Sequence, residues 1–217
     1  MIPAISLLAG YSIHKKNMLE RNYDDYQIDR HKQNLYNIIT NDYNQVKGLR
    51  IRHMVWLSHF IKCDIIEVGR LQYNYHSIVD LDCLDTKKHH IELHIPGGRP
   101  LDMKEIENSF KNSRKYIYKY FNLAHNKELE HYVQSWLLSP ELKYFLKGNS
   151  NILNFQKLFT VLKYKENLKD FMLFVFNLFD VPLDFTILET RTSLQKEMKK
   201  HLLEGKKLHI GIAILKN

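Results

Sequence analysis

The sequence has few of the residues that build covalent frameworks and long turns. Its 217 residues include two cysteines, five prolines and eight glycines. Cys63 and Cys83 are too few for a disulfide framework, and neither lies in a C-x-x-C or Cys/His metal pattern. A disordered chain is also excluded, because 44% of the residues are hydrophobic and 26% are charged. The composition is that of a globular protein in a reducing compartment, and we expect a cytoplasmic location.

The sequence also lacks a hydrophobic run long enough to cross a bilayer, which takes about 20 residues. The opening segment Met1–Gly10 is apolar, but it has no basic region and runs directly into His14, Lys15 and Lys16. This pattern differs from that of a secretory signal. We therefore interpret the segment as a buried first element and expect no membrane partner.

Positive charge exceeds negative charge. The chain has 32 Lys and Arg against 24 Asp and Glu, a formal net charge of +8. Such a charge attracts nucleic acid, anionic membranes and phosphate-bearing cofactors alike. The basic residues are spread along the whole chain, with short clusters such as Lys199-Lys200 and Lys206-Lys207, which is typical of a solvated surface. Nucleic-acid binding is an alternative that rests on net charge alone.

The hydrophobic periodicity predicts both helices and strands. Apolar residues at helical spacing predict helices over residues 25–46 and 49–61. Strands are predicted over 64–75, where Gly69 indicates a bulge or a close backbone approach, and over 89–95. Further predicted elements are helix 103–120, strand 131–138, a short helix after Ser139-Pro140, strand 152–163, helix 168–178, helix 193–203 between Thr192 and Gly205, and strand 208–215. This order excludes a helical solenoid and an all-β sandwich and predicts an α/β (α+β) protein with one mixed sheet flanked by helices.

Four short motifs occur in order along the chain: Gly69–Gln72, His94–Leu101, Ser135–Leu142 and Ser150–Gln156. With the element order, they resemble the successive motifs of bacterial acyltransferases that have an N-acyltransferase N-terminal domain and a GNAT-like C-terminal domain. The resemblance implies a GNAT-like mixed central sheet. We expect an N-terminal helical segment over residues 1–62, packed on the sheet, and a GNAT-like domain over 63–217, sharing one continuous core.

Members of that family carry additional sequence before the segment that corresponds to Ile2–Ala4. The chain is therefore expected either to be a short version of the family or to begin inside its first domain. In the second case, the first strand of the GNAT fold would be missing.

The resemblance implies an enzyme that transfers an acyl group from acyl-CoA or acetyl-CoA to a small-molecule amine or hydroxyl acceptor. GNAT-like enzymes hold the CoA thioester where two neighbouring parallel strands separate. In this chain, those strands are 89–95 and 131–138. The turn Gly97-Gly98 lets backbone N–H groups approach phosphate oxygens, and Arg99 can add a bidentate contact.

Two features of the sequence oppose phosphate binding at this turn. The usual GNAT cradle, with Arg or Gln two residues before Gly-x-Gly or Gly-x-Ala, is absent. In addition, Asp102, Glu105 and Glu107 place negative charge in the first turns of the following helix. A plain strand-to-helix loop is therefore the alternative interpretation.

Acyl transfer to an amine needs a base for the acceptor and an acid for the leaving thiolate. Glu92 and His94 share one face of the predicted strand 89–95 and are the candidate bases. Ser135 lies on the facing strand, and Tyr144 lies on the helix after it, where GNAT enzymes often place a tyrosine acid. The alternatives are a plain polar strand face for Glu92 and His94 and a packing role for Tyr144.

No metal site is expected. His90 and His94 share a strand face, but they lie four residues apart, and His89 points to the other face. The sequence also contains no Walker loop, Gly-x-Ser-x-Gly or His-Glu-x-x-His motif. The missing Gly-x-Gly string and the acidic helix start favour a second class of function, a non-catalytic GNAT-fold binding module. The oligomeric state is not determined by any of these patterns.

Overall fold

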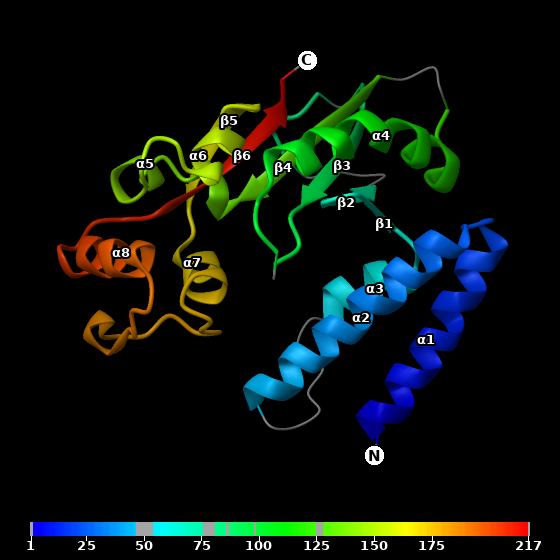
Figure 1. Ribbon diagram of the computed structural model, residues 1–217, viewed down its shortest axis with the longest axis horizontal. Helices are drawn as coiled ribbons and strands as arrows, with labels where there is room; N and C mark the ends of the chain where they lie inside the picture. Colours follow the sequence, from blue (N-terminus) through cyan, green and yellow to red (C-terminus); the bar gives the residue numbers. More distant parts are fainter. Residues whose placement is uncertain are drawn as a thin grey trace. The chain divides into compact units, whose positions relative to one another are not determined.

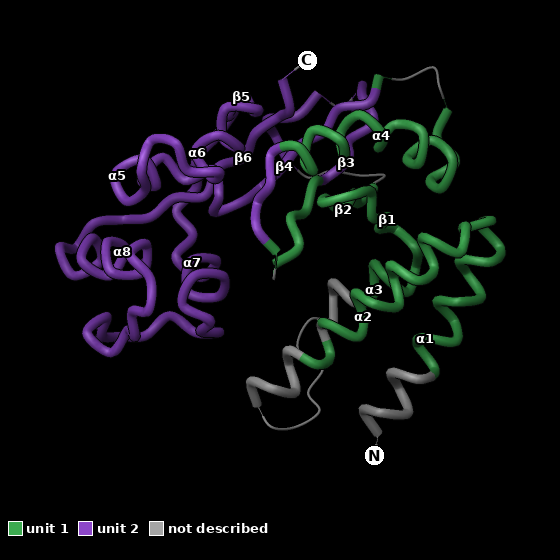
Figure 2. Tube along the Cα trace, in the orientation of Figure 1, with its two compact units in different colours: residues 1–78, 93–99, 104–128 green, residues 79–92, 100–103, 129–217 purple. Residues whose placement is uncertain are grey.

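The computed structural model describes residues 2–46, 54–75, 81–85, 87–97, 99–124 and 128–216. The chain divides into two compact units (Figure 2). Unit 1 holds residues 1–78, 93–99 and 104–128, and unit 2 holds residues 79–92, 100–103 and 129–217. The domain division at residue 62 that the sequence suggests stays a prediction.

Helices and strands alternate along most of the chain (Figure 1). The α-helices are α1 (Ile2–Glu20), α2 (Asp25–Val46), α3 (Met54–Ile61), α4 (Met103–Phe121), α5 (Leu142–Phe145), α6 (Asn151–Gln156), α7 (Leu168–Phe174) and α8 (Ser193–Leu203). The strands are β1 (Ile65–Val68), β2 (Leu71–Tyr75), β3 (His89–His94), β4 (Leu129–Ser135), β5 (Phe159–Glu166) and β6 (His209–Leu215). Two short 3₁₀ helices, η1 (Trp136–Leu138) and η2 (Phe185–Ile187), complete the described elements. None of the described helices is long and apolar enough to span a membrane.

The strands form one mixed sheet in the order β1-β2-β3-β4-β6-β5. β1 and β2 form an antiparallel hairpin in unit 1. In unit 2, β3 pairs with β4 in parallel, and β6 pairs antiparallel with both β4 and β5. The predicted fold class, a mixed sheet flanked by helices, is confirmed.

In unit 1 the two faces of the β1–β2 hairpin carry different side chains. Ile66 and Tyr73 face each other across the register and are fully buried, as expected for an apolar strand face. On the opposite face the register pairs Glu67 with Gln72, and both side chains are also buried. This hairpin therefore needs polar partners on one side.

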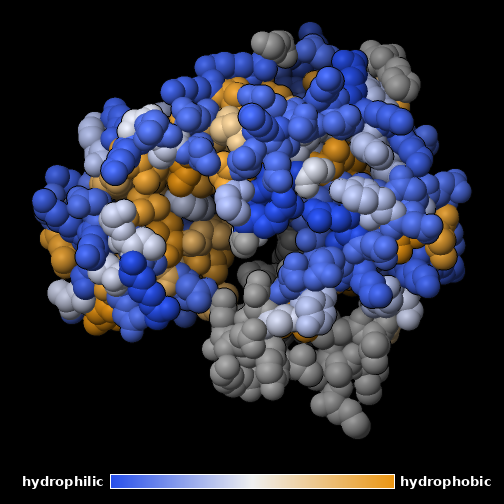
Figure 3. All heavy atoms as spheres, viewed as in Figure 1, coloured by the Kyte–Doolittle hydropathy of each residue, from blue (hydrophilic) through white to orange (hydrophobic). Residues whose placement is uncertain are grey.

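Unit 2 has an apolar core around β6, α7 and α8. Phe171, Met172, Met198, Leu202 and Ile210 are all buried in this cluster. The last residue of α7, Phe174, and the segment between α7 and α8 also expose large apolar side chains, those of the segment including Val181, Leu183 and Ile187. Figure 3 shows apolar side chains on the surface of this part of the molecule.

Several predicted elements agree closely with the structure. The helices expected at 25–46, 103–120 and 193–203 correspond to α2, α4 and α8. Thr192 caps α8 in a capping box with Gln195, and Gly205 ends the helix region with φ +72°. The apolar opening segment lies within α1, but the side-chain burial of residues 1–8 lies outside the described residues.

The prediction of one strand over residues 64–75 was wrong. The segment forms the β1–β2 hairpin, and Gly69 lies in its turn with φ +61°. The alternative reading of Gly69 as a close backbone approach is confirmed, because a Cβ there would lie 2.6 Å from Ser109 Oγ. The turn is held by a hydrogen bond of 2.7 Å from the Arg70 N–H to the same oxygen.

Two other strand predictions were wrong in extent. Residues 152–163, expected to be the longest strand, contain α6, whose N-cap is Ser150, and only the start of β5. The apolar residues of α6 fit a helical period as well as the alternation of a strand, so their spacing alone could not distinguish a helix from a strand. Strand 131–138 ends at Ser135, where η1 begins.

Two buried histidines stack where α1, α2 and α3 of unit 1 meet. The rings of His14 and His31 lie 5.1 Å apart, and those of Tyr23 and Phe60 pack edge-on against His31. Burial lowers the pKa of His14 to about 4 and that of His31 to about 3, and each histidine is therefore neutral in the fold. Neither ring nitrogen of His31 has a hydrogen-bond partner among the described residues.

These histidines make folding sensitive to acid. Their pKa values in the fold lie below the unfolded value of 6.5, so stability is complete above pH 6.5 and is lost as pH falls towards 4 and then 3. We expect His31→Phe to take up about one proton fewer on unfolding in this range. Urea titrations from pH 7 to pH 4 measure the difference, and parallel stability curves for the variant and the wild type would contradict it.

The packing of η1 on β6 depends on Gly211. A Cβ at this position would lie 2.6 Å from Leu138 Cβ and 3.1 Å from its carbonyl oxygen. We expect Gly211→Ala to lower the free energy of unfolding by about 1–3 kcal/mol, as other overpacked substitutions do. Gly148→Ala is the matched control, because a Cβ at Gly148 meets nothing within 4 Å. Equal denaturation midpoints for both variants would show that η1 can shift to accommodate the added Cβ without loss of stability.

Candidate functional site

The candidate site of unit 2 lies where the parallel pairing of β3 and β4 ends. The register runs from His89 with Leu129 to Glu92 with Tyr132. From Tyr132 to Ser135, β4 pairs with β6 instead. The first half of β4 is therefore paired with β3 on one edge and the second half with β6 on the other edge, and the two ladders overlap at Tyr132, in the middle of the strand. Ligands of open α/β sheets bind outside such strand ends.

Polar side chains line one face of this parallel pair. The Glu130 carboxylate accepts a hydrogen bond of 2.8 Å from Lys88 Nζ and lies 3.4 Å from His90 Nε2. Two residues further along both strands, the register places Glu92 opposite Tyr132. Along this face, Lys88 and His90 lie beside the Glu130 carboxylate, and Glu92 and Tyr132 follow.

The surroundings of this row fix the protonation of two of its members. Burial raises the pKa of Tyr132 far above its ordinary value, and the charge and hydrogen bond of Glu92 raise it further. Burial lowers the pKa of His90 more than the nearby Glu130 carboxylate raises it. The phenol is therefore neutral at physiological pH and keeps its proton.

Ser135, a predicted catalytic residue, lies at the end of β4 as expected and caps η1. Its Oγ accepts a hydrogen bond of 3.1 Å from the Leu137 N–H. Gln156 holds the same turn, because its Nε2 donates to the carbonyl oxygens of Leu137 and Ser139 at 2.9 and 3.0 Å. The motifs Ser135–Leu142 and Ser150–Gln156 therefore act together to shape the chain beyond β4.

A carboxylate–histidine pair joins this turn to the start of β6. Glu141 Oε1 lies 2.7 Å from His209 Nδ1, and the hydroxyl of the buried Ser139 donates to Glu141 Oε2 at 2.6 Å. The backbone N–H of His209 also donates to Glu141. The hydrogen bonds from Ser139 and His209 outweigh burial and lower the pKa of Glu141. The pair fastens two segments that lie far apart in the sequence.

The predicted acid, Tyr144, lies on the surface. Its side chain on α5 is 71% exposed, and Lys143 Nζ lies 4.9 Å from the ring centroid. Such exposure provides no low-dielectric surroundings to tune a catalytic proton. Tyr132, by contrast, is buried, and its sequence context does not mark it as a site residue.

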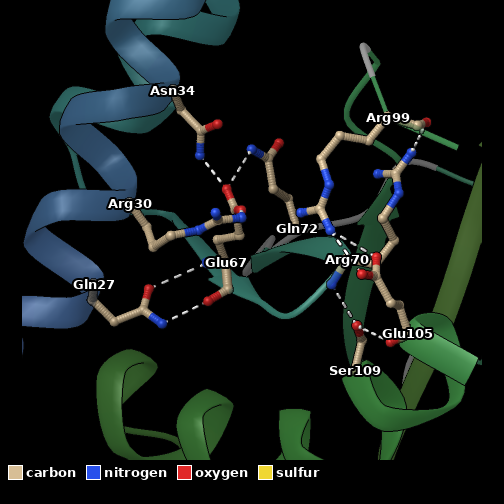
Figure 4. Close-up of polar contacts among 9 residues, drawn as sticks. All are labelled: Gln27, Arg30, Asn34, Glu67, Arg70, Gln72, Arg99, Glu105 and Ser109. Atoms are coloured by element: carbon tan, nitrogen blue, oxygen red, sulfur yellow. Dashed lines mark hydrogen bonds and ion pairs between the residues drawn. The ribbon is translucent and has the colours of Figure 1, made fainter.

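The predicted phosphate turn belongs to unit 1. Gly97 is exposed, and a Cβ there would meet nothing within 4 Å, while Gly98 lies outside the described residues. Arg99 Nη2 donates to both oxygens of Glu105 at 2.9 and 2.8 Å (Figure 4). The Arg99 carbonyl accepts a hydrogen bond from the Arg70 guanidinium at 3.0 Å. The arginine expected to meet a phosphate thus holds a carboxylate of the following helix.

A second polar cluster in unit 1 surrounds Glu67 on β1. Arg30 and Asn34 on α2 contact its carboxylate, and Gln72 Nε2 donates to it at 3.3 Å (Figure 4). Gln27 on the same helix bonds to the backbone N–H and C=O of Glu67. The cluster joins α2 to the hairpin, and the polar face of the hairpin thereby gains its partners.

The structure brings some of the predicted site residues together. Glu92 and His94 are half-buried and share a face of β3 by alternation, with Glu92 in unit 2 and His94 in unit 1. Ser135 lies on the same strand as Tyr132, but at odd spacing, so its side chain points to the other face. Tyr132 could be identified only from the strand register, because β-strand tyrosines have no distinguishing local pattern. Among the described residues, no group of three or more His, Cys, Asp or Glu is placed to hold a metal ion.

Comparisons with known proteins identify the family and the fold. Residues 65–215 match the family described as GNAT-like C-terminal domain. A crystal structure of an acyltransferase in complex with decanoyl-CoA matches with a TM-score of 0.83 and 21% identity, covering 99% of this chain and 65% of that one. A structure of an acyltransferase with decanoyl-CoA and teicoplanin matches with a TM-score of 0.82 and 21% identity, covering 97% and 64%.

The chain thus spans about two thirds of the length of these structures, and at this level of identity the likeness shows a shared fold. The comparison with curated proteins finds no match. The resemblance that the four sequence motifs suggested is confirmed. Since the family match covers more than half of the sequence, the chain belongs to the GNAT-like C-terminal domain family.

Proposed function

We propose that this protein is an acyl-CoA-dependent acyltransferase that transfers an acyl group to a small-molecule amine or hydroxyl acceptor. The observation that carries the proposal is the end of the β3–β4 ladder. There the register of a GNAT-family sheet places the Glu92 carboxylate opposite the buried, neutral phenol of Tyr132. The similar folds that hold decanoyl-CoA support the same cofactor class.

In this proposal Glu92 serves as the base, and His94, two residues further along β3, is the second candidate. An ammonium acceptor gives a proton to the base, directly or through water. The amine nitrogen then forms a C–N bond with the thioester carbonyl carbon. In the resulting tetrahedral adduct the nitrogen still carries one proton more than the amide does. As the C–S bond breaks, the CoA thiolate leaves with the electron pair and takes up this second proton, which gives the amide and the CoA thiol.

The proposed cofactor contacts lie at the turn of residues 97–99. Backbone N–H groups there and the Arg99 guanidinium are the proposed phosphate ligands. Because the Arg99 and Glu105 side chains are each about half exposed, at 49% and 46%, the pair can open towards solvent. An exposed ion pair of this kind contributes only about 0–1 kcal/mol, so a phosphate can compete for the arginine.

The same ion pair favours a second function, a non-catalytic GNAT-fold binding module. If Arg99 stays paired with Glu105, and no Gly-x-Gly string offers backbone N–H groups to a phosphate, the fold has no phosphate-binding site. Such a module binds another ligand or a partner protein. Direct binding measurements separate the two functions.

We expect saturable binding of CoA thioesters in calorimetric titrations with acetyl-CoA, decanoyl-CoA and CoA at low and moderate salt. ATP is the phosphate-bearing control, because binding by net charge alone would not distinguish it from CoA. Arg99→Ala should weaken the binding by about tenfold, through loss of a charge-assisted contact. Arg191→Ala is its matched control, since this exposed arginine pairs only with Glu189 among the described contacts. Equal affinity for ATP and CoA, or no binding, would favour the non-catalytic module.

We expect Glu92→Gln and His94→Ala to lower turnover more than they lower stability. Loss of a general base costs typically about 10²–10⁴ in rate, whereas a single substitution at a half-buried position such as these typically costs about 0.5–3 kcal/mol of stability and leaves the protein folded. Thiol release from the acyl-CoA, with an amine acceptor screen, measures turnover, and thermal melting measures stability. The exposed Glu189 provides the control substitution Glu189→Gln. If both variants keep full turnover, neither residue is the base.

A further inference from the structure

A hollow of about 360 Å³ lies in unit 1 beside the C-terminal end of α1, and its volume is at the small end of the range for ligand pockets. Its lining comes from the last turn of α1 with the residue that follows it, and from the connection between α3 and β1. The lining residues are Asn17, Glu20, Arg21, Lys62 and Asp64. All five side chains are polar or charged, so the hollow suits a small polar ligand.

Hydrogen bonds to backbone carbonyl groups fix two of these side chains. Asn17 Nδ2 donates to the carbonyl oxygen of Ile61 at 2.8 Å, and Arg21 Nη1 donates to that of Cys63 at 2.8 Å. Cys63 follows the end of α3 in a left-handed conformation with φ +57°, and its N–H donates to the Phe60 carbonyl at 2.9 Å. The end of α1 and the α3–β1 connection are therefore joined directly, and the hollow that both of them line keeps its shape.

The charges that line the hollow are of both signs. Arg21 and Lys62 are cationic, whereas Glu20 and Asp64 are anionic. Among the described residues, no ion pair joins either base to either acid. The acids contact side chains outside this lining, at 3.7 Å for Glu20 and 3.5 Å for Asp64. A simple anion or cation is therefore attracted by one half of the lining and repelled by the other, while a ligand with one charge of each sign is attracted by both.

We propose that this hollow binds a small zwitterion of the α-amino-acid type. The Arg21 guanidinium and the Lys62 ammonium receive its carboxylate, since Arg21 keeps N–H donors beyond the one that holds Cys63. The carboxylates of Glu20 and Asp64 receive its ammonium. The proposed acyl transfer uses none of these residues, so this site is additional to that function and does not depend on it.

The affinity at this site is limited by its exposure, because water and salt screen charges at a protein surface. The side chain of Glu20 is 62% exposed and that of Asp64 is 31% exposed, so Asp64 contributes more to binding. We expect a dissociation constant of about 1 mM. The ligand bridges α1 and the α3–β1 connection, and its binding therefore also stabilises the folded state at saturating concentrations.

An NMR titration of the whole chain with L-alanine tests the proposal. Propionate and ethylamine are the matched probes, because each lacks one of the two charges of L-alanine. We expect L-alanine to shift the amide signals of residues 17–21 and 62–64 in a saturable way, and the other two probes to bind at least about tenfold more weakly. Equal affinity for propionate and L-alanine would show attraction of anions by net charge alone and would overturn the proposal.

Two variants assign the charges. Lys62→Gln and Asp64→Asn each remove one charge from the lining, and we expect each to weaken L-alanine binding about tenfold through loss of a charge-assisted contact. Lys16→Gln is the matched control, since Lys16 lies on α1, is 76% exposed and does not line the hollow. Arg21→Gln is less informative, because Arg21 also holds the Cys63 carbonyl. Unchanged affinity in both lining variants, or no shift with L-alanine up to about 50 mM, contradicts the site.

The titration is independent of acyl transfer. It uses no CoA thioester, so a lack of turnover leaves its result unchanged, and a lack of L-alanine binding leaves the proposed function unchanged. Raising the salt concentration to about 0.5 M is a further check, because screening should weaken a contact between charges several-fold. Binding that does not depend on salt would count against the proposed contacts.

Discussion

The change of partner along β4 is the constraint on which the candidate site depends. Residues up to Tyr132 are paired with β3, and residues from Tyr132 to Ser135 are paired with β6. The chain then turns into η1, and three residues make this turn possible. Ser135 caps η1, Gln156 binds the carbonyl groups of Leu137 and Ser139, and Gly211, which has no side chain, leaves room for Leu138. Segments far apart in the sequence thus fix where one strand ends, and with it the position of the Glu92–Tyr132 pair.

Unit 1 depends on a different interaction, which is the pairing of a buried carboxylate. Glu67 is 3% exposed on a hairpin whose other face is apolar. A buried carboxylate is costly unless it is paired and fully hydrogen-bonded, and Arg30, Asn34 and Gln72 provide these contacts. Since these contacts are specific in position as well as in charge, they fix the register of α2 against the hairpin, which apolar packing alone would leave less well defined.

Sequence periodicity predicted the fold class and most elements because the amphipathic helices and the final strand have clear spacing. It failed where local patterns are ambiguous: Gly69 lies in a turn instead of a bulge, and residues 152–156 alternate while forming a helix. The strand face of Glu92 and His94 was predictable from alternation. Tyr132 was not, because its position opposite Glu92 appears only in the strand register. The Arg99–Glu105 pair was not predictable, because the sequence gives the charges of the two residues but not the fold of the turn that brings them together.

That ion pair changes the electrostatic argument about the turn at residues 97–99. From the sequence alone, Glu105 is expected to repel a phosphate at the start of α4. In the structure its charge is balanced locally by Arg99, and the half-exposed pair lies in solvent that screens it strongly. Asp102 and Glu107 also lie near the start of α4, where the helix dipole favours negative charge. A phosphate approaching the turn therefore meets an exchangeable ion pair, and the acidic helix start opposes binding less than its composition suggests.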